Sequence, residues 1–503
     1  MPRPPSKRQL AIGILITAFI VGFLSRLIPR PSSDRAVFVS VAESLLSGHR
    51  LYADIYDNKD PLFFYAVSMQ RLLGGVGEHL FELFMVALAA LSAYDMARML
   101  ARTGATHQRL LLIAVPLLVT GGAWVPGYPQ LPATAFSLLT CSLFLRGKMA
   151  FAGACIGIVA LTKLIMFPVP MAFCLAHECV LWNGKRSWGR FRQLIIGFTA
   201  VVMLMIYILL ARHELLGYLQ AQHNNFLYSN SVLVDNSNLR NAFASHLRTI
   251  FLGPPNQLIL LVSAMASMLF SGYVATRTCE ETKIKAFLVG TLAAYLLSIM
   301  VLGLTGIWWH HLQLIYFSQS LMLVYMAIRL HSRTALANSL FGLAIIILAI
   351  LFSGSGNLRH YVASPMQAMA QMSSLTQESL EAKAFRAAYP QGAGYARLGQ
   401  NSNVIPHGAP KDKLLCPEFA QYFFYSPERL RHILDCAKSA PVLVVDSSFS
   451  PYANPADWWP RESQKQSMLK NWNDFVAAGE KIIDAHYSCR KLGNVRICES
   501  VAR

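Results

Sequence analysis

Long apolar stretches alternate with short polar segments over the first two thirds of the chain. A helix that crosses a bilayer needs about 20 mostly apolar residues. About eleven stretches approach that length, and each predicts a transmembrane helix. They lie at 10–28, 79–100, 109–125, 131–146, 149–162, 165–183, 193–212, 256–276, 286–304, 312–330 and 336–353. The first is longer than the apolar core of a signal peptide, and further spans follow it, so we expect an uncleaved helix.

Lysine and arginine gather in alternate connections between these stretches. The connections at 122–130 and 304–311 contain neither residue. The connections on the other side contain Arg3, Lys7, Arg8, Arg98, Arg102, Arg109, Arg146, Lys148, Lys185, Arg186, Arg190, Arg192, Arg277, Lys283, Lys285, Arg329 and Arg333. Because cytoplasmic loops are enriched in Lys and Arg, the N-terminus is predicted to be cytoplasmic. An odd number of spans then places the C-terminal tail outside.

Three long segments are therefore predicted to lie outside the membrane on the extracytoplasmic side. They are a first loop at 29–78, a middle loop at 213–255 and the tail at 354–503. In the tail, residues 374–389 have the pattern of a helix, whereas APVLVVDSS and GNVRICES have the pattern of strands. We expect an all-α polytopic membrane bundle over 1–353, followed by a small extracytoplasmic α/β domain.

Composition agrees with a membrane protein and excludes other classes. Of 503 residues, 54% are apolar and only 14% are charged, against about 25% charged in soluble domains. The mean hydropathy is +0.40. A soluble globule cannot bury that much apolar surface, and disordered and fibrous chains have other compositions. We assign most of the net charge of +18 to cytoplasmic loops rather than to nucleic-acid binding.

The nine cysteines fall into two groups. Five lie in predicted spans or a cytoplasmic loop, and four lie in the tail: Cys141, Cys155, Cys174, Cys179 and Cys279, then Cys416, Cys436, Cys489 and Cys498. An even number of cysteines in a polar segment outside the membrane indicates two disulfides. Of the possible pairings, sequence order makes Cys416–Cys436 with Cys489–Cys498 the simplest. The alternative is four free thiols in a cytoplasmic tail.

A short amphipathic segment, PSSDRAVFVSVAESLLSG, follows the first predicted span. Ser33 or Asp34 is suited to cap a helix that Gly48 ends. Val37 and Val41 belong to an apolar face, so we expect this helix to lie along the outer membrane surface. Asp34 then sits at the mouth of the bundle, where a charge is a functional candidate. The alternative is that Asp34 only caps the helix.

The next segment, LYADIYDNKDPLFFY, mixes charges with aromatic rings. Its charged residues are Asp54, Asp57, Lys59 and Asp60, and its aromatic residues are Tyr52, Tyr56, Phe63, Phe64 and Tyr65. Aromatic rings beside charges at a membrane surface suit either interfacial anchoring or sugar binding. Lys59 offers a compact cation for a phosphate. The alternative is an aromatic belt with solvated charges.

Lys163 stands alone between two predicted spans in AGACIGIVALTKLIMFPVP. It is a candidate phosphate ligand at the outer surface, and the alternative is a lysine that only extends its ammonium group to the interface. A short loop at 127–130 and the pair His310 and His311 fall at the same level. The histidines suit a metal or a phosphate, or only interfacial hydrogen bonds.

Together these segments resemble the polytopic GT-C glycosyltransferases that use lipid-phosphate sugars, in particular the protein mannosyltransferase and lipid A aminoarabinose transferase branch. Asp34 follows the first span as the family's catalytic acidic residue does. AESLLSGHRLYADIYDNKDPLFFY is similar to the family's leader helix followed by Gly, Tyr-x-Asp and Lys-x-Pro-Leu, with Lys59 and Pro61 on its Lys and Pro. GACIGIVALTKLIMFPVP resembles its Leu-Thr-Lys segment, with Lys163 on the Lys. WWHHLQLIYFSQSLML resembles the start of a late span, with His310 or His311 on the family's His.

Two features depart from the family pattern. The family's first motif is usually Asp-Glu, whereas this chain has Asp34 followed by Arg35. Many members carry a second carboxylate in the outer loop after the third span, where this chain has Gln130. A second acidic role is then absent or falls to Glu43, Asp54, Asp57 or Asp60. The resemblance covers about residues 1–353 and leaves the tail without a match.

The resemblance implies transfer of one sugar from a polyprenyl-phosphate donor to a glycan, lipid or protein acceptor at the outer face of the cytoplasmic (inner) membrane. Asp34 is expected to act as general base. The expected donor-phosphate ligands are Lys59, Lys163, Arg212 and Arg240, and the expected sugar or acceptor contacts are Tyr52, Tyr56, Asp57, Asp60, Tyr65, His310 and His311. No metal or other cofactor is required, although Asp57 or Asp60 could hold a divalent cation. Membrane lipids are expected partners, and nucleic acid is not.

Three other classes compete with this interpretation. A flippase or transporter would show polar or broken positions deep in the spans, whereas the charges here gather at the outer surface. A glycan polymerase or ligase transfers whole chains from a diphosphate carrier, and the long loop directly after the first span favours the GT-C interpretation. A receptor or scaffold that works through its tail leaves Asp34, Lys59 and Lys163 unexplained.

Overall fold

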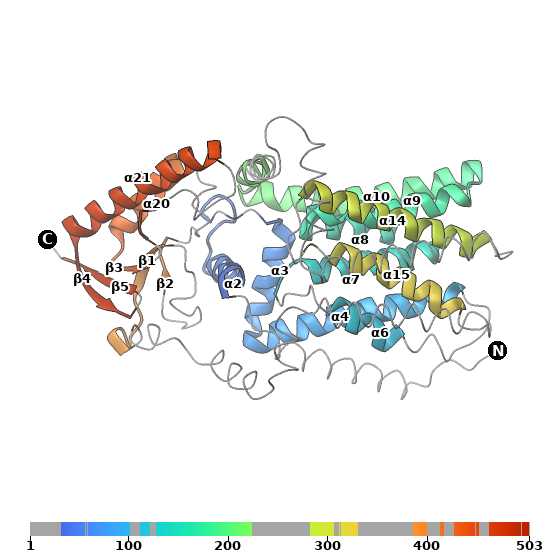
Figure 1. Cartoon of the computed structure of the whole chain (residues 1–503), viewed down its shortest axis with the longest axis horizontal. Coiled ribbons are helices and arrows are strands. Elements are labelled where there is room, and N and C mark those ends of the chain that lie inside the picture. Colours follow the sequence, from blue (N-terminus) through green and yellow to red (C-terminus); the bar gives the residue numbers. More distant parts are fainter. Residues whose placement is uncertain are drawn as a thin grey trace. The chain divides into compact units, whose positions relative to one another are not determined.

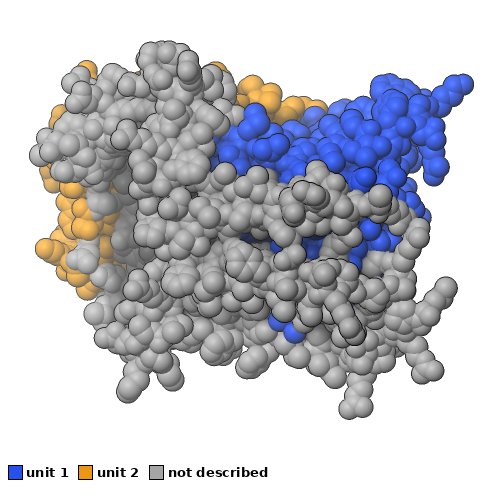
Figure 2. All heavy atoms as spheres, turned by 45° about the vertical axis from the view of Figure 1, so that its right-hand side comes forward, with its two compact units in different colours: residues 1–29, 73–207, 239–372 blue, residues 30–72, 208–238, 373–503 orange. Residues whose placement is uncertain are grey.

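The structure is a computed structural model of residues 1–503. It describes residues 32–55, 57, 59–100, 111–120, 127–223, 282–305, 311, 313–329, 385, 387–399, 413–416, 427–447, 449–451, 462–493 and 495–501. The chain forms two compact units (Figure 2). Unit 1 comprises Met1–Pro29, Leu73–Tyr207 and Leu239–Met372, and unit 2 comprises Arg30–Leu72, Ile208–Asn238 and Ser373–Arg503. Unit 2 thus combines parts of the three segments that the sequence predicts to be extracytoplasmic.

Unit 1 contains a bundle of helices that lie side by side (Figure 1). They are α4 (Gly74–Leu100), α6 (Leu111–Val119), α7 (Gln130–Leu145), α8 (Met149–Thr162), the short 3-10 helix η1 (Leu164–Met166), α9 (Pro168–Val180), α10 (Gly184–Ala211), α14 (Thr282–Thr305) and α15 (Gln313–Arg329). One continuous apolar core runs through these helices. Helices that are apolar on several faces are either buried in such a core or exposed to lipid.

Two glycines bring the backbones of α8 and α10 into contact. A Cβ on Gly153 would lie 1.9 Å from the carbonyl oxygen of Leu194. A Cβ on Gly197 would lie 1.8 Å from the carbonyl oxygen of Ala150. Small residues at helix crossings are typical of membrane bundles because they allow this close approach.

Helices coincide with the predicted spans wherever the chain is described, and α8 has the predicted bounds. Leu80–Leu100, Gly184–Ala211 and Thr282–Gly303 are long and apolar enough to cross a membrane. The other apolar helices of the described part are shorter. The predicted spans at 10–28, 256–276 and 336–353 lie outside the described residues. The total of about eleven spans therefore stays a prediction.

Several helices begin at residues other than those predicted, and α9 and α10 show the physical reasons. The span expected at 165–183 begins as η1, and α9 starts at Pro168, which has no N–H and suits the first turn of a helix. Helix α10 starts at Gly184, ahead of the predicted 193. Its first turns, GKRSWGRFR, are polar but helical, so hydropathy marks the apolar part of a helix and misses its polar extension.

Unit 2 begins with two packed helices, α2 (Ser32–Leu46) and α3 (Pro61–Leu72). Helix α2 is the predicted amphipathic helix, and it is followed by Gly48 in the left-handed region at φ 92°. Its buried side is formed by Phe38, Val41 and Ala42. The Phe38 ring lies 5.0 Å from the Phe63 ring of α3. Part of the apolar face predicted for the membrane surface therefore packs within the protein, and contact with a membrane stays a prediction.

The tail contains a five-stranded mixed sheet in the order β2-β1-β3-β5-β4. The strands are β1 (Gly394–Leu398), β2 (Lys413–Leu414), β3 (Val442–Asp446), β4 (Tyr487–Leu492) and β5 (Val495–Ser500). Strand β1 pairs in parallel with β2 and β3, whereas β5 pairs antiparallel with β3 and β4. The two strands predicted from sequence, β3 and β5, are confirmed. The predicted helix at 374–389 lies largely outside the described residues.

Two helices accompany this sheet, α20 (Pro427–Ser439) and α21 (Glu462–His486). Every residue of β3 is buried, which fits its apolar sequence VLVVD and its central position. Trp472 of α21 is 1% exposed and packs against Phe449 and Phe475. These contacts give the tail an apolar core separate from that of the helical bundle.

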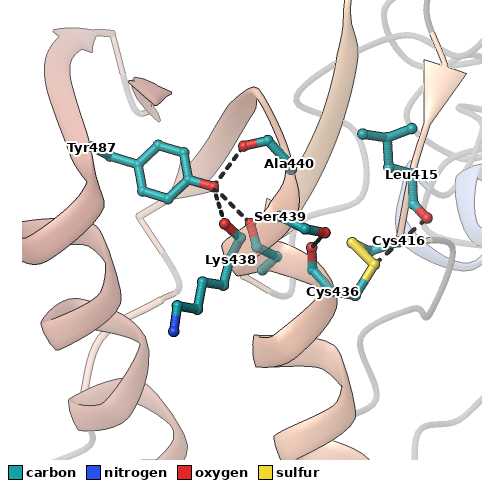
Figure 3. The surroundings of a disulfide bond; sticks show 8 residues. Leu415, Cys416, Cys436, Lys438, Ser439, Ala440 and Tyr487 are labelled. Carbon is teal, nitrogen blue, oxygen red and sulfur yellow. Dashed lines mark hydrogen bonds between the residues drawn. A yellow bond between two sulfur atoms is a disulfide. The ribbon is translucent and has the colours of Figure 1, made fainter. Parts of the chain in front are cut away.

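Two disulfides join elements of the tail in the pairing that sequence order predicts. Cys416 bonds to Cys436 of α20, and Cys489 bonds to Cys498 across the β4–β5 register. Near the first disulfide, the Tyr487 hydroxyl lies 2.6 Å from the carbonyl oxygen of Ala440 and 3.2 Å from that of Lys438 (Figure 3). Tyr487 therefore satisfies carbonyl groups at the end of α20, which the helix itself leaves unpaired.

Candidate functional site

The predicted general base lies in the first turn of α2. Asp34 is part of Ser32–Leu46, and its side chain is outside the described residues. Phe38 follows Asp34 by four residues, so the two positions lie on one side of the helix, one turn apart. Phe38 is 2% exposed and contacts both Phe63 and Phe64 of α3, with ring centroids 5.0 Å and 6.1 Å away. Packing between α2 and α3 therefore fixes the helix that carries Asp34.

Lys59 approaches the same helix from the loop that precedes α3. Its ammonium nitrogen lies 5.8 Å from the centroid of the Phe38 ring. Its backbone N–H donates to Oδ1 of Asp57 at 2.9 Å, and its carbonyl oxygen accepts from the Tyr52 hydroxyl at 2.5 Å. Lys59 is thus held at both backbone groups while its cation faces an aromatic ring, a favourable contact.

Tyr52 shapes the loop that carries Lys59. It has φ 63°, is 1% exposed, and its ring lies 5.2 Å from that of Tyr218. Burial, followed by the nearby charge of Asp60, raises the pKa of Tyr52 well above its ordinary value. A Cβ on Gly217 would lie 2.4 Å from the Tyr52 carbonyl oxygen, so only glycine fits at that position. The Tyr52 hydroxyl donates within the protein and organises the loop.

Two of the acidic residues considered for a second acidic role pair with arginine. Glu43 of α2 contacts Arg71 of α3 at 2.7 Å, and burial is the main cause that raises its pKa. Asp54 accepts from the Arg50 side chain at 2.8 Å, which lowers the pKa of Asp54. Arg50 also donates its backbone N–H to Asp54 at 2.8 Å, which closes the turn before Lys59. Both carboxylates therefore contribute to local structure.

Asp60 has a different environment. It is 5% exposed and precedes the first residue of α3. Its Oδ1 accepts from the Tyr218 hydroxyl and from Nε2 of Gln222, each at 3.3 Å. Tyr218 and Gln222 belong to the helical residues 215–223, at the start of the predicted middle loop. Asp60 therefore joins the first and middle loops within unit 2.

Glu214 is a site residue that the sequence analysis missed. It is fully buried and accepts three hydrogen bonds, from the Leu51 N–H at 2.8 Å, from Nε of Arg212 at 2.7 Å and from the Tyr65 hydroxyl. Burial and the bond to Glu214 raise the pKa of Tyr65 well above its ordinary value. Arg212 also donates to the carbonyl oxygen of His49 at 3.3 Å. Arg212 and Glu214 are charged residues two positions apart at the end of an apolar stretch. This local pattern was the sequence signal that could have indicated Glu214.

In unit 1, Lys163 occupies the joint between α8 and η1. Its backbone is extended, with φ −155° and ψ 93°, and its N–H donates to the Val159 carbonyl oxygen at 2.8 Å. Its own carbonyl oxygen accepts from the Met166 N–H at 2.9 Å. A half-buried lysine thus ends one apolar helix where the chain turns into the next, as the sequence predicts.

Buried acidic residues of α4 lie at its N-terminal end, near the loop that contains Gln130. Glu78 and Glu82 are 8% and 6% exposed. Oε1 of Glu82 accepts from the Gly127 N–H at 2.6 Å. Gln130 is 3% exposed, and its side-chain amide makes no hydrogen bond to other described residues. Glu82 therefore supplies a carboxylate to this loop from a neighbouring helix, which spacing within the loop could not indicate.

The remaining predicted residues belong to unit 1 or lie outside the described part of the chain. His311 is 8% exposed and belongs to unit 1, as does Lys163. Tyr56, Arg240 and His310 lie outside the described residues. Among the residues that the structure describes, no three His, Cys, Asp or Glu side chains gather to hold a metal ion. Lys59, Tyr52, Asp57, Asp60, Tyr65 and Arg212 are brought together in unit 2.

No protein-family model and no curated protein matches the chain. Similar solved structures include the archaeal oligosaccharyltransferase AglB from Archaeoglobus fulgidus, in complex with an inhibitory peptide and a dolichol-phosphate, at 12% identity, 98% coverage of this chain, 74% of that chain and TM-score 0.45. The arabinofuranosyltransferase AftD from Mycobacteria matches at 12% identity, 100% and 40% coverage and TM-score 0.48. ArnT from Cupriavidus metallidurans, bound to undecaprenyl phosphate, matches at 14% identity, 98% coverage of both chains and TM-score 0.38.

All three are GT-C glycosyltransferases, the class that the sequence resembles. The identities are 14% or less and the TM-scores are below 0.5, so these likenesses carry no argument about this chain. The roles of individual residues in this chain are therefore argued from its own sequence and contacts.

Proposed function

We propose that this protein is an integral membrane glycosyltransferase that moves one sugar from a polyprenyl-phosphate donor to a glycan, lipid or protein acceptor. The reaction would take place at the outer face of the cytoplasmic membrane. The observation that supports it most directly is the contact between the Lys59 ammonium and the Phe38 ring, 5.8 Å from its centroid, in the helix that carries Asp34 one turn earlier.

This arrangement supplies an acid and a cation of the kind that the reaction needs. An acceptor hydroxyl is a poor nucleophile near neutral pH, and a carboxylate within hydrogen-bond reach can take its proton as the new bond forms. The departing phosphate carries negative charge, and a fixed cation stabilises that charge more strongly in a partly dry site than in water. We assign the first role to Asp34 and the second to Lys59.

The proposed transfer is a single displacement. The acceptor oxygen bonds to the anomeric carbon of the sugar while the bond from that carbon to the phosphate oxygen breaks. Asp34 takes the hydroxyl proton, and polyprenyl phosphate leaves with the electron pair of the broken bond. Such a displacement inverts the configuration of the anomeric carbon.

Lys163 is proposed as a second phosphate ligand, and its place at a helix joint in an otherwise apolar region supports this role. Arg240, His310 and His311 stay candidate ligands. Arg212 is assigned instead to charge balance, because its Nε donates to buried Glu214 at 2.7 Å. Tyr65 and Asp60 are likewise assigned to holding the first and middle loops together around Lys59.

Glu82 is proposed for the second acidic role that the sequence left open. Its carboxylate contacts Gly127 in the loop that holds Gln130, and burial beside apolar helices would strengthen its interactions with a sugar hydroxyl. The tail, with its two disulfides, is proposed to lie on the extracytoplasmic side and to help select the acceptor.

A transfer assay tests the proposed function. Purified protein would be given a panel of radiolabelled donors that includes polyprenyl-phosphate sugars and one diphosphate-linked glycan, together with extracted envelope acceptors. We expect transfer from one polyprenyl-phosphate sugar by the wild type and by Asp474→Asn, a matched change at an exposed position of α21. We expect transfer by Asp34→Asn to be at least about a hundredfold slower. Transfer only from the diphosphate donor would favour a polymerase or ligase, and donor translocation without transfer would favour a flippase.

A further inference from the structure

A cation-lined cavity of about 430 Å³ lies in unit 1, and none of its lining residues is assigned to transfer. Its charged lining comprises Arg146, Arg186, Arg190 and Lys283, and His177 also contributes. The lining comes from the C-terminal ends of α4, α7 and α9 and from the first turns of α10 and α14. These are the helix ends that the charge pattern predicts to be cytoplasmic, whereas the donor site is proposed for the outer face.

Two of the arginines are balanced by carboxylates. Arg146 donates to Asp95, with Nε at 2.7 Å, and Nη1 of Arg190 lies 3.0 Å from Oε2 of Glu178. Arg186 and Lys283 form no ion pair with any residue that the structure describes. The cavity therefore carries an excess of positive charge that an anion would neutralise.

The wall of the cavity also contains buried polar groups without partners. His177 is 3% exposed, and neither ring nitrogen forms a hydrogen bond with the described residues. The same holds for Nε of Arg190, although its guanidinium group lies 5.2 Å from the Phe144 ring centroid. Buried polar groups are normally hydrogen-bonded, so unpaired donors in the wall of a cavity indicate a missing acceptor.

Membrane topology alone explains cations near the cytoplasmic surface, but it does not explain a buried histidine and a buried guanidinium nitrogen without acceptors. Phosphate oxygens accept several hydrogen bonds at once, and arginine is suited to bind them. The volume exceeds what a single water or halide needs and lies in the range of small-ligand sites.

We propose that this cavity binds a phosphate ester, with Arg186 and Lys283 at its exposed rim and Arg190 and His177 in its wall. The phosphate belongs either to an anionic lipid headgroup of the inner leaflet or to a soluble phosphate compound. The proposal is independent of the transferase function, because none of these residues takes part in the proposed transfer.

Thermal unfolding of the full-length protein in nanodiscs of phosphatidylcholine would test this site. One arm adds short-chain phosphatidylglycerol, one adds short-chain phosphatidylcholine and one adds inorganic phosphate. The test variant is Arg186→Gln with Lys283→Gln. The control, Lys185→Gln with Arg192→Gln, removes the same charge from exposed positions of α10 that do not line the cavity.

Phosphatidylglycerol is expected to raise the unfolding midpoint saturably in the wild type and the control, and phosphatidylcholine is expected to leave it unchanged. The test variant should need at least tenfold more phosphatidylglycerol for the same shift. If inorganic phosphate gives a saturable shift that only the test variant loses, the site stands and its ligand is soluble. Equal responses of the two double variants, or no response to either phosphate source, would overturn the proposal.

Discussion

The ammonium nitrogen of Lys59 lies 5.8 Å from the ring centroid of Phe38, one helical turn after Asp34 in α2. The contact joins a cation of the first loop to the helix that carries the proposed general base. Phe38 is itself fixed by the Phe63 and Phe64 rings of α3. The packing of α2 on α3 thus fixes both the helix that carries Asp34 and the ring that Lys59 contacts.

Phe38→Leu should weaken donor binding because it removes the aromatic face under Lys59. A cation–π contact of about 1 kcal/mol corresponds to about fivefold in affinity. We expect KM for the donor to rise by that factor while kcat changes little, and Phe38→Tyr should restore the wild-type value. An unchanged donor KM for Phe38→Leu would show that the Phe38 ring does not help Lys59 to bind the donor.

Lys163→Ala should lower donor affinity about tenfold or more, because a charge-assisted contact to a phosphate contributes about 1.5–3 kcal/mol. Lys163→Arg should retain most of the affinity, since it keeps the charge. The direct readout is the affinity of the purified protein for polyprenyl phosphate. Equal affinities for wild type and Lys163→Ala would leave Lys163 as an interfacial anchor.

Glu214→Gln should destabilise unit 2, because the buried carboxylate accepts bonds from Leu51, Arg212 and Tyr65. Leaving Arg212 without its charge partner should cost about 2–3 kcal/mol. The matched change Glu43→Gln weakens a pair with Arg71 that is partly exposed, unlike fully buried Glu214, and should cost less than about 1 kcal/mol. Chemical unfolding followed by tryptophan fluorescence compares the two, and an equal cost would contradict the assignment of Glu214.

The disulfides predict a labelling pattern. Without reduction, the four tail cysteines should resist alkylation in the denatured protein, because both pairs are bonded. After reduction of intact spheroplasts, a membrane-impermeant maleimide should label those cysteines and leave Cys279 unlabelled. Alkylation of all four tail cysteines before reduction would contradict both the bonds and the predicted orientation.

Replacing Cys416 and Cys436 together by serine should lower the stability of the tail by about 3 kcal/mol, given their separation of 20 residues along the chain. Removing a crosslink of this length enlarges the conformational freedom of the unfolded tail. Limited proteolysis of the membrane-bound protein should show faster cleavage within residues 413–439. Unchanged cleavage would mean that the sheet holds this segment without the bond.

The sequence predicts the helices of the bundle well because a long apolar stretch is a local property of the chain. Helix α8 was predicted at its observed bounds for this reason. Strand β3 is a short apolar run, and β5 begins with alternating apolar and polar residues. The cysteine pairs follow sequence order, so these features were also available from sequence.

Features that depend on contacts between distant segments were missed. Helix α3 starts at Pro61 after a run of charges. Its aromatic residues suggested interfacial anchoring or sugar binding, and not a helix packed on α2. Strand β4 has mostly exposed residues and is ordered by pairing with β5. The partners of Glu214 and Glu82 could not be predicted locally, because the bonds to Leu51 and Gly127 cross 163 and 45 residues of chain.

The most direct test of the account is single-turnover transfer by Asp34→Asn with the donor already bound. A general base contributes about 10²–10⁴ in rate. We predict that Asp34→Asn binds the polyprenyl-phosphate sugar with wild-type affinity, keeps the wild-type unfolding midpoint and transfers at least a hundredfold more slowly. A folded Asp34→Asn protein that binds the donor and transfers the sugar at a rate close to wild type would contradict the assignment of the base and the mechanism built on it.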